Sequence, residues 1–419
     1  MTETGSAPRS DWRAMISLYA AMMAVGMGQS VVFAVLPMLG RELALHEMLW
    51  QLPFTELTIA PKEMAITSLS ALTALVFFMT SPYWGRKSDV WGRKPVIIIG
   101  LFGYTIGTML FNAVAWMGLV SILGGGLLYV LLMVSRGIHA ALMSATHPAS
   151  AAYMVDVTDI SRRAQGMAKL QAFNQLGVML GPALAWFVAF SYLTPLYLQA
   201  ALAALVAILV WRYLPAIPAH SSGGKRPKRM AYFDPRYRLF IFIGFALYSL
   251  LGMVQQTLGF YFQDLLSLDG VAAAQWFSAA MIVSSGAMLF AQFVVVQRYN
   301  GSPMNLLFMG LPFSCAGYLL LALSDTLPML LSAMGLFGFG MGLTGPAYGA
   351  SASLVVEPHE QGGLAGLLGS VAGLGFVAGP LVGGFLYRIA PSYPYFCAAA
   401  VMALIIVVMV SRRRQIAKG

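Results

Sequence analysis

Residues 71–111 read ALTALVFFMTSPYWGRKSDVWGRKPVIIIGLFGYTIGTMLF, in which two long apolar runs flank a short loop rich in Arg and Lys. A helix needs about 20 apolar residues to cross the hydrocarbon core of a bilayer, and each run reaches that length together with its flanks. Loops on the cytoplasmic side of a membrane carry an excess of Lys and Arg. The stretch therefore predicts two spanning helices joined by a cytoplasmic loop.

The rest of the chain continues this pattern. Of its 419 residues, 59% are hydrophobic and only 10% are charged, whereas a soluble domain has about 25% charged residues. The N-terminus lacks the layout of a cleavable signal peptide, so the first apolar run is expected to remain as a span. We therefore expect an all-α membrane protein with twelve transmembrane helices, at 14–40, 64–84, 95–117, 120–154, 163–189, 192–213, 239–263, 274–297, 303–323, 327–356, 361–387 and 393–411.

The charges between these runs predict the orientation of the chain. With both termini in the cytoplasm, nearly all Lys and Arg residues lie on the cytoplasmic side, and the opposite side carries acids such as Glu63 and Asp264. This asymmetry follows the positive-inside rule. The net charge of +10 is thus explained by topology and does not indicate nucleic-acid binding. We expect a multi-pass protein of a bacterial inner membrane with both termini in the cytoplasm.

The chain is predicted to consist of two six-helix bundles, residues 1–214 and 239–419. Between them, residues 215–238 are rich in Pro, Gly, Ser and basic residues, which is typical of a linker. The linker could be a plain tether or could rest on anionic lipid headgroups. Short motifs recur in corresponding spans and suggest duplication of a six-helix unit: Gly26-Met27-Gly28-Gln29 with Gly252-Met253-Val254-Gln255, Pro148-Ala149 with Pro346-Ala347, and Gly177-x-x-x-Gly181-Pro182 with Gly375-x-x-x-Gly379-Pro380.

The loop after the second span has the pattern G-x-x-x-D-x-x-G-R-K, with Gly85, Asp89, Gly92 and Arg93 at its fixed positions. Glycines permit a tight turn at the membrane face, and an arginine can pair with a carboxylate. The pattern resembles the signature loop of the major facilitator superfamily. That resemblance implies the twelve-helix fold and a cytoplasmic conformational latch, with Asp156 and the start of span eleven near Gln361-Gly362 as the expected partners.

The Gly177, Gly181 and Pro182 motif in span five is similar to one in the drug:proton antiporter branch of that superfamily. Small residues four apart let helices approach closely, and proline bends a helix. The sequence departs from the branch pattern, because Ala185 and Trp186 stand where a glycine pair is expected. The motif could therefore serve gating or only close packing of helices.

Span four carries three side chains that are costly or titratable at membrane depth, Arg136, His139 and His147. A charge at the centre of a spanning helix costs about 2.5–3.5 kcal/mol on insertion scales. Arg136 could clamp a substrate carboxylate, take part in proton coupling with His139 or His147, or anchor neighbouring carbonyl groups. Its position resembles the antiporter motif of span four, but His139 and Ala140 replace the usual Gln and Gly.

Further polar and amphipathic residues lie on spans one, seven and ten, which line the cavity in proteins of this superfamily. Glutamine within a span commonly hydrogen-bonds to a neighbouring helix, and tyrosine can form an amphipathic wall. The candidate substrate-binding residues are Gln29, Tyr248, Gln255, Gln256 and Tyr348, together with Arg136 and His139.

The sequence thus predicts a secondary active transporter, most simply a proton-coupled exporter of a small amphipathic neutral or anionic solute. A drug or a carboxylate-bearing metabolite such as a siderophore fits a cavity with Arg and Gln and no carboxylate near the midplane. A proton-coupled importer on the same fold is the alternative. The chain contains no H-E-x-x-H, no G-x-S-x-G and no P-loop, so we expect neither an enzyme nor an ATP-driven pump. We expect a monomer without cofactor or metal.

Overall fold

The structure of the protein is a computed structural model that describes residues 12–51, 58–158, 163–217, 231–357 and 360–416. Most of the predicted linker, residues 218–230, lies outside these ranges. The helices before the linker are α1 (Trp12–Glu42), α2 (Glu63–Trp91), α3 (Arg93–Leu119), α4 (Gly125–Met143), α5 (Thr146–Val157), α6 (Arg163–Leu180), the 3₁₀ helix η3 (Gly181–Ala189) and α7 (Thr194–Tyr213).

After the linker the chain is again helical. The elements are α8 (Arg238–Leu266), α9 (Gly270–Phe290), the π-helical turn η4 (Ala291–Val295), the 3₁₀ turn η5 (Val296–Arg298), α10 (Pro303–Leu323), α11 (Leu327–Ser353), α12 (Gln361–Ile389) and α13 (Tyr393–Ile416). Between α1 and α2 lie a 3₁₀ turn, η1 (Leu45–Glu47), and two short antiparallel strands, β1 (Trp50–Gln51) and β2 (Thr58–Ile59).

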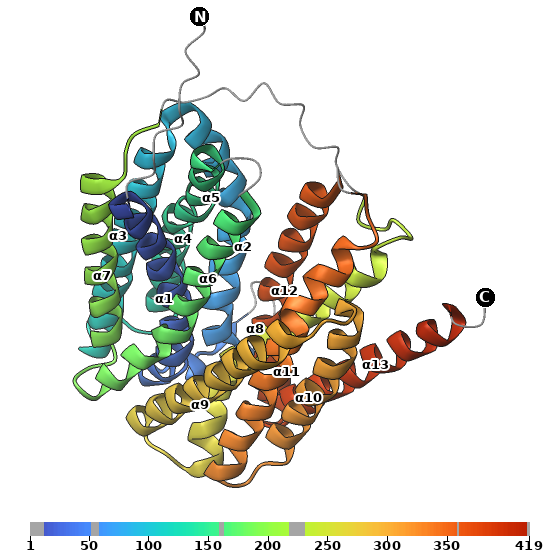
Figure 1. Ribbon diagram of the computed structural model, residues 1–419. Coiled ribbons are helices and arrows are strands. Elements are labelled where there is room, and N and C mark those ends of the chain that lie inside the picture. The colour runs from blue at the N-terminus through green and yellow to red at the C-terminus, as the bar shows by residue number, and fades with distance from the viewer. Residues whose placement is uncertain (1–11, 52–57, 159–162, 218–230, 358–359, 417–419) are drawn as a thin grey trace, which may run out of the picture. The chain divides into compact units, whose positions relative to one another are not determined.

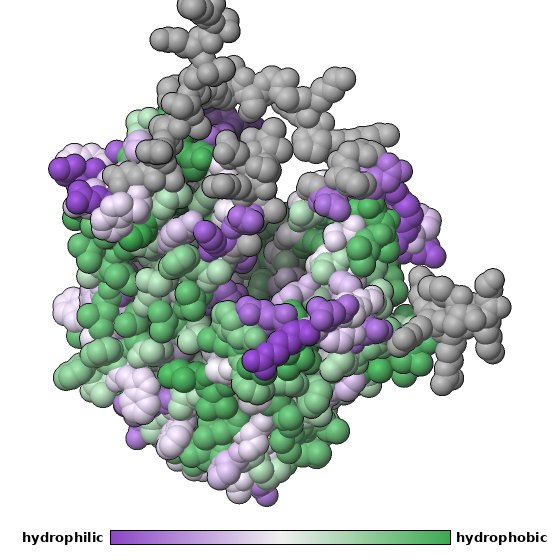
Figure 2. All heavy atoms as spheres, in the orientation of Figure 1, coloured by the Kyte–Doolittle hydropathy of each residue, from purple (hydrophilic) through white to green (hydrophobic). Residues whose placement is uncertain are grey.

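The expected fold class and number of spans are confirmed. Twelve helical stretches of the described chain are long and apolar enough to cross a membrane. Many large apolar side chains on these helices are exposed, among them Phe102, Leu127, Phe385 and Val407, and Figure 2 shows apolar residues over much of the visible face. In water such a surface would be unfavourable, whereas in a bilayer it faces lipid. The chain is therefore a multi-pass membrane protein.

The fourth span is interrupted, which its apolar sequence does not predict. Two residues separate α4 from α5. Pro148 has no backbone N–H, so the carbonyl of Ser144 loses its helical hydrogen bond. At the break, the Ala145 N–H donates to Leu142 O. The carbonyl of Ala141 instead accepts a hydrogen bond from Trp84 Nε1 of α2 at 2.6 Å. A neighbouring helix thus satisfies the backbone, as the bilayer interior requires.

The contacts divide the chain into two units (Figure 1). Unit 1 consists of Met1–Leu36 and Leu72–Gly224, and unit 2 of Pro37–Ala71 and Lys225–Gly419. The ends of α1 and α2 that meet the connecting strands therefore belong with the C-terminal spans. The bundles predicted at 1–214 and 239–419 follow chain order and remain a prediction about the sequence repeat.

Unit 1 is built around α3, which packs on both α4 and α7 (Figure 1). Its core is apolar and draws on α1, α3, α5, α6 and α7, with Leu18, Ile97, Tyr153 and Val210 almost completely buried. In unit 2, α8 packs along α12, and α11 packs on α9 and α10. Small side chains spaced along the helices let them approach closely.

The glycine motif of span five brings α6 against α1 in unit 1. A Cβ atom at Gly177 would overlap Met23 O and lie 2.9 Å from Met27 N. Gly181 lies against Met27 and Ser30 of the same helix. The backbones of the two helices are therefore in direct contact along the motif, and whether the motif also serves gating stays a prediction.

The glycine motif of span eleven makes the same contact in unit 2. A Cβ atom at Gly379 would overlap Ser249 O and lie 2.9 Å from Met253 N of α8. In the sequence repeat, Met253 corresponds to Met27. Because Gly177 contacts Met27 and Gly379 contacts Met253, the packing equates these two glycines.

Relative to the match of Met27 with Met253, the predicted match of the two glycine motifs is therefore displaced by one helical turn. The sequence suggests that Gly177 corresponds to Gly375, but Gly375 packs earlier on α8, near Tyr248. Pro182 falls at the start of η3, whereas Pro380 lies inside α12. Repeated glycines four residues apart cannot by themselves fix a register, which is why the sequence match is displaced by a turn.

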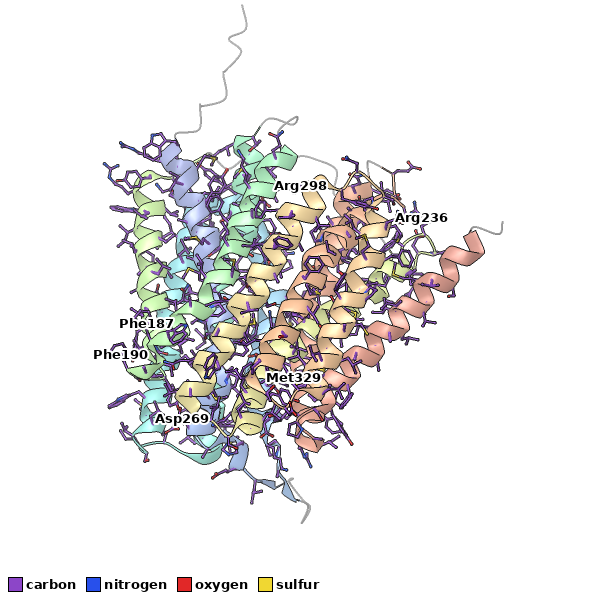
Figure 3. All side chains as sticks on the ribbon, turned by 60° about the horizontal axis from the view of Figure 1, so that its bottom comes forward. Phe187, Phe190, Arg236, Asp269, Arg298 and Met329 are labelled. Carbon is purple, nitrogen blue, oxygen red and sulfur yellow. The ribbon has the colours of Figure 1, made fainter. Side chains whose placement is uncertain are left out.

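The span that begins with α9 has an acid at one end and a base at the other. Figure 3 shows Asp269 at one end of the span that begins with α9 and Arg298 at the other end, with Arg236 on the side of Arg298. The basic end is the one that the charge pattern predicts to face the cytoplasm. The Asp269 side chain caps α9 by accepting the Ala272 N–H at 2.8 Å.

We predict that Gly177→Ala lowers the thermal stability of the purified protein in detergent, because the added methyl group meets the α1 backbone. Overpacking of this kind costs about 1–3 kcal/mol. Gly137→Ala is the matched control, since a Cβ atom there meets nothing within 4 Å among the described residues and alanine favours a helix more than glycine does. Equal melting temperatures for Gly177→Ala and Gly137→Ala would contradict the close contact with α1.

Candidate functional site

The most unusual group in unit 1 is the buried cation of Arg136. The residue is only 5% exposed. The guanidinium lies over the ring of Phe111, 5.4 Å from the ring centroid. Within the described part of the chain, its Nε has no hydrogen-bond partner, and no carboxylate or carbonyl accepts a hydrogen bond from Arg136. The contact that the carbonyl-anchor interpretation needs is therefore missing from the described residues.

His139 lies one turn along the same helix and faces α3. Its Nδ1 is 3.3 Å from Thr108 Oγ1, and its ring meets the ring of Tyr104 edge to face at 4.7 Å between centroids. Gly107 makes room for it, because a Cβ atom at that position would lie 2.6 Å from the Cα of His139. The Tyr104 hydroxyl donates to Gly28 O of α1 at 3.4 Å. Buried polar groups thus run from α4 through α3 to α1.

His147, the third candidate in span four, is separated from this group by the helix interruption. It belongs to α5, whereas Arg136 and His139 belong to α4. Arg136 and His139 are thus brought together by the structure, and His147 stands apart. Gln29, next to Gly28 on α1, is half-buried.

A buried residue that the sequence argument missed is Asn112 of α3. It is completely buried, and neither its Nδ2 nor its Oδ1 has a hydrogen-bond partner among the described residues. It directly follows Phe111, the ring beneath the Arg136 guanidinium. Unpaired amide atoms in a protein interior are unfavourable unless water or a ligand satisfies them. An asparagine within an apolar span is the signal that could have identified it.

A second set of candidate residues lies in unit 2. The rings of Tyr248 and Tyr348 meet at a steep angle, 6.5 Å between centroids, and Tyr248 also lies 5.8 Å from the ring of Phe376. Gln255 and Gln256 are both buried. The amide atoms of Gln256 and the hydroxyl of Tyr348 lack hydrogen-bond partners in the described ranges. The structure thus brings Tyr248 and Tyr348 together, and within the residues it describes it gives no contact of either glutamine with them; solute sites commonly combine such aromatic walls with unsatisfied hydrogen-bonding groups.

The loop between α2 and α3 holds a cluster of charges. Arg93 donates to Asp156 of α5 from Nε at 2.9 Å, to Ser88 from Nη1 at 2.7 Å, and from Nη1 to Asp89. Gly92 has φ +89°, a value that strongly favours glycine. The predicted pairing of Arg93 with Asp156 is present, and the role as a latch stays a prediction.

One detail of this loop differs from expectation. Gly85 is predicted to help form the turn, but α2 continues through it to Trp91, and the turn comes at Gly92. A Cβ atom at Gly85 would only touch Pro148, at 3.8 Å, so neither the backbone nor the packing requires glycine there. The other expected partner of the loop, the start of span eleven near Gln361-Gly362, belongs to unit 2 and remains a prediction.

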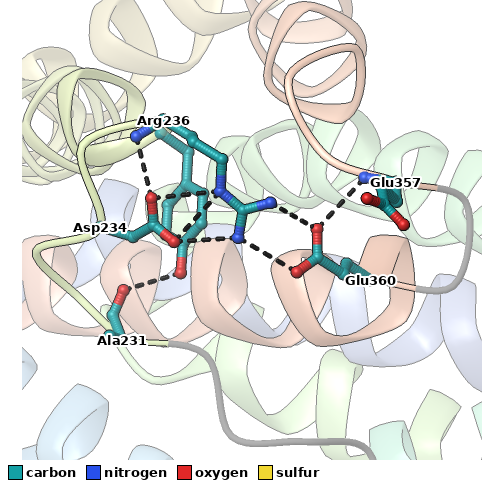
Figure 4. A network of polar contacts seen from close by, with 6 residues as sticks. Ala231, Asp234, Arg236, Glu357 and Glu360 are labelled. Atoms are coloured by element: carbon teal, nitrogen blue, oxygen red, sulfur yellow. Dashed lines mark hydrogen bonds and ion pairs between the residues drawn. The ribbon is translucent and has the colours of Figure 1, made fainter.

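Unit 2 contains a comparable cluster that the sequence argument missed (Figure 4). Arg236 donates to Asp234, and to Glu360 from Nη1 at 2.8 Å and from Nη2 at 3.1 Å. Glu360 also accepts the Glu357 N–H at 3.2 Å. The hydrogen bonds from Arg236 lower the pKa of the Asp234 carboxyl. Acidic residues within an otherwise basic cytoplasmic surface are the signal that could have revealed this cluster.

Comparison with known proteins identifies the relatives. A family model for the Major Facilitator Superfamily matches residues 18–348 and 301–418. Multidrug resistance protein 1 of Bacillus subtilis is 27% identical and is matched over 81% of this chain and 85% of its own length. Tetracycline resistance protein, class C, of Escherichia coli is 28% identical and is matched over 77% of this chain and 80% of its own length.

Solved structures agree on the fold. The crystal structure of the human organic anion transporter MFSD10 (TETRAN) superposes with a TM-score of 0.66 at 17% identity, covering 96% of this chain and 100% of that one. A bacterial homologue of the human lysosomal transporter Spinster, in an inward-facing and occupied conformation, superposes with a TM-score of 0.69 at 13% identity. The match covers 97% of this chain and 96% of that one. At these identities the likeness concerns the fold alone.

We predict that Asp89→Asn and Asp156→Asn each slow solute transport while leaving expression near that of the parent chain. Either change removes a charged partner of Arg93, and a hydrogen bond to a charged group is worth about 1.5–3 kcal/mol, which corresponds to about tenfold or more in rate. Arg86→Gln is the control, because Arg86 is an exposed cation of the same segment. Full transport by both carboxylate variants in vesicles would contradict the predicted role of this loop as a latch.

Proposed function

The chain belongs to the major facilitator superfamily, and from this premise we propose that it exports a small amphipathic neutral or anionic solute in exchange for protons. The protein is a transporter of small molecules in a lipid bilayer. The relatives named for multidrug and tetracycline resistance support the export of drug-like solutes. A carboxylate-bearing metabolite such as a siderophore is a further candidate of the same chemistry.

The observation that carries the anionic preference is the cation of Arg136, which has no ion-pair partner among the described residues. A buried charge is unfavourable without a partner, and the described residues give this guanidinium an aromatic ring but no carboxylate. A carboxylate on the solute would supply two acceptor oxygens in the plane that a guanidinium recognises. His139 lies one turn away to receive or orient further polar groups of the solute.

Unit 2 offers its own set of candidate substrate-binding residues. Tyr248 and Tyr348 would stack against the apolar body of an amphipathic solute, and Gln256 would offer both a donor and an acceptor. Gln29 of α1 and Gln255 of α8 complete the proposed residues. The amide atoms of Gln256, unpaired within the described chain, support this assignment, because such groups are commonly satisfied by water or ligand.

The proposed proton coupling involves fewer residues than the proposed substrate binding. Arg136, His139 and His147 are the proposed participants, and histidine is the side chain whose ordinary pKa suits proton exchange near neutral pH. The contact between His139 and Thr108 would orient the imidazole ring. Because His147 belongs to α5 and His139 to α4, the two histidines would serve different steps.

The proposed cellular placement follows from the charge pattern. We propose that the protein lies in a bacterial inner membrane with both termini in the cytoplasm and acts as a monomer. The Arg93 and Arg236 clusters would then lie at the cytoplasmic surface. Import by proton symport is the second candidate, because the same fold can run in either direction as the gradients dictate.

The test is flux into proteoliposomes of the purified protein with an imposed proton gradient, using an anionic and a cationic dye of similar size. We expect transport of the anionic dye that collapses when the gradient is dissipated. Arg136→Ala should lower that flux about tenfold or more, because a charge-assisted hydrogen bond contributes about 1.5–3 kcal/mol. Arg136→Lys should retain part of it, since a point charge remains.

Arg212→Gln serves as the control, because Arg212 is a cation at the end of α7 outside the buried cluster. Preference for the cationic dye, undiminished in Arg136→Ala, would refute the anionic assignment. The direction is decided separately: accumulation of the dye on the acidic side of the membrane supports export by proton exchange, and accumulation on the opposite side supports import.

A further inference from the structure

Arg41 is the centre of an ion-pair cluster at the end of unit 2 that the charge pattern predicts to face outward. Its Nη2 donates to Asp264 Oδ2 at 2.7 Å and to Glu63 Oε1 at 3.0 Å, and its Nη1 donates to Asp264 Oδ1 and, at 2.9 Å, to Gln263 Oε1. The side chains of Arg41 and Glu63 are only 15% and 12% exposed. This burial distinguishes the cluster from ordinary surface ion pairs, which contribute little.

Two aromatic residues complete the cluster. Tyr387 of α12 donates its hydroxyl proton to Asp264 Oδ2 at 2.6 Å. The guanidinium of Arg41 also lies over the ring of Phe260, 4.8 Å from its centroid. Asp264 therefore accepts hydrogen bonds from two different helices, α1 and α12. The cluster draws together four spans: α1, α2, α8 and α12.

The helix positions of the charges explain why they depend on one another. Arg41 lies in the last turn of α1 and Glu63 in the first turn of α2, where the helix dipoles favour a cation and an anion respectively. Asp264 lies near the C-terminal end of α8, where the dipole disfavours a carboxylate. Asp264 therefore needs the cation of Arg41, and separating the two would leave a carboxylate in an unfavourable place unless water reached it.

The cluster joins the two halves of the sequence. Arg93 pairs with acids of the first six spans, and Arg236 pairs with acids that follow the linker. The pair of Arg41 with Asp264, in contrast, links the first span to the seventh. Transport by alternating access requires the outer ends of the two sets of spans to part and rejoin, so this contact would have to break once in each cycle.

The same four helices also pack closely through uncharged residues. A Cβ atom at Gly384 of α12 would overlap Thr67 Oγ1 and lie 2.9 Å from the Cα of Met64, both on α2. A Cβ atom at Gly259 of α8 would lie 3.3 Å from Pro37 of α1. The outer ends of α1 and α2 therefore fit against α8 and α12 through glycines as well as through ion pairs.

We propose that Arg41, Glu63 and Asp264, with Tyr387, form a lock that holds the outer end of the transporter closed, and that Gly384 provides the close seat on which the lock engages. The lock rests on the proposed transport by alternating access. It acts on the conformation and not on the solute, so it assigns these residues a role separate from that of Arg136.

The test measures whether the outer end opens, independently of any solute. A cysteine replaces Met38, which is 1% exposed on α1 one turn from Arg41, in a chain whose Cys315 and Cys397 are changed to Ser. Labelling by a membrane-impermeant maleimide added from outside is timed in intact cells. We expect slow labelling of this parent chain and labelling at least about tenfold faster in Asp264→Asn, because the buried cation of Arg41 loses the one of its two carboxylate partners that lies on α8.

A charge exchange tests the pairing itself. Asp264→Arg alone places two cations beside Glu63 and should label quickly. Combined with Arg41→Asp, it restores one cation between two carboxylates and should return the rate toward that of the parent. Recovery in the double variant also shows that fast labelling of the single variant does not come from misfolding.

A steric variant tests the seat without touching a charge. Gly384→Val should also speed labelling, because its side chain meets the backbone of α2. Gly369→Val on the same helix should not, because a Cβ atom at Gly369 meets none of the described residues within 4 Å. Asp325→Asn, an exposed acid on the same predicted side, should leave the rate unchanged.

The outcomes separate the lock from the function on which it rests. Equal labelling of the parent and of Asp264→Asn overturns the lock, whatever solute is transported. Failure of the charge exchange to slow labelling overturns the pairing of Arg41 with Asp264. Labelling as expected together with an absence of dye flux retains the lock and rejects the proposed solute, since the maleimide rate requires no substrate.

Discussion

Charged side chains in this structure depend on partners, because the hydrocarbon of the bilayer offers no water to a charge that lies away from the membrane surface. Only 10% of the residues are charged, and three arginines of the described chain are each held between two carboxylates: Arg41 by Glu63 and Asp264, Arg93 by Asp89 and Asp156, and Arg236 by Asp234 and Glu360. Among the described residues Arg136 has no such pair, although it is deeply buried. That contrast separates the cations that hold helices together from the one assigned to the solute.

Much of the architecture could be predicted from sequence, because spanning length and charge asymmetry are strong signals. The twelve spans and the family follow from the apolar runs and from the loop around Asp89 and Arg93. The predicted turn at Gly85 was wrong, since a sequence pattern cannot tell a glycine inside a helix from one in a turn. The break after Met143 was not predicted, because the apolar run continues through it and only Pro148 hints at it.

The candidate site could be predicted only in part. Arg136 and His139 stand out because charged and titratable residues are rare in spans, and the structure places them one turn apart on α4 against α3. Asn112 was missed because a single amide in an apolar run carries little weight until its burial and its surroundings are known. Glu63 and Asp264 were interpreted as marks of topology alone, since the cluster around Arg41 draws on four spans and no local pattern relates its residues.

The hydrogen bonds at the break in the fourth span constrain how unit 1 can move. Trp84 of α2 donates to a carbonyl at the end of α4, and the Thr80 hydroxyl lies 2.8 Å from that of Ser144 at the same point. In hydrocarbon, sliding α2 past this point would strand these groups, because lipid tails offer neither donors nor acceptors. We therefore expect the part of α2 around Trp84 to move together with the end of α4, so that a displacement at the Asp89 loop would reach the helix that bears Arg136.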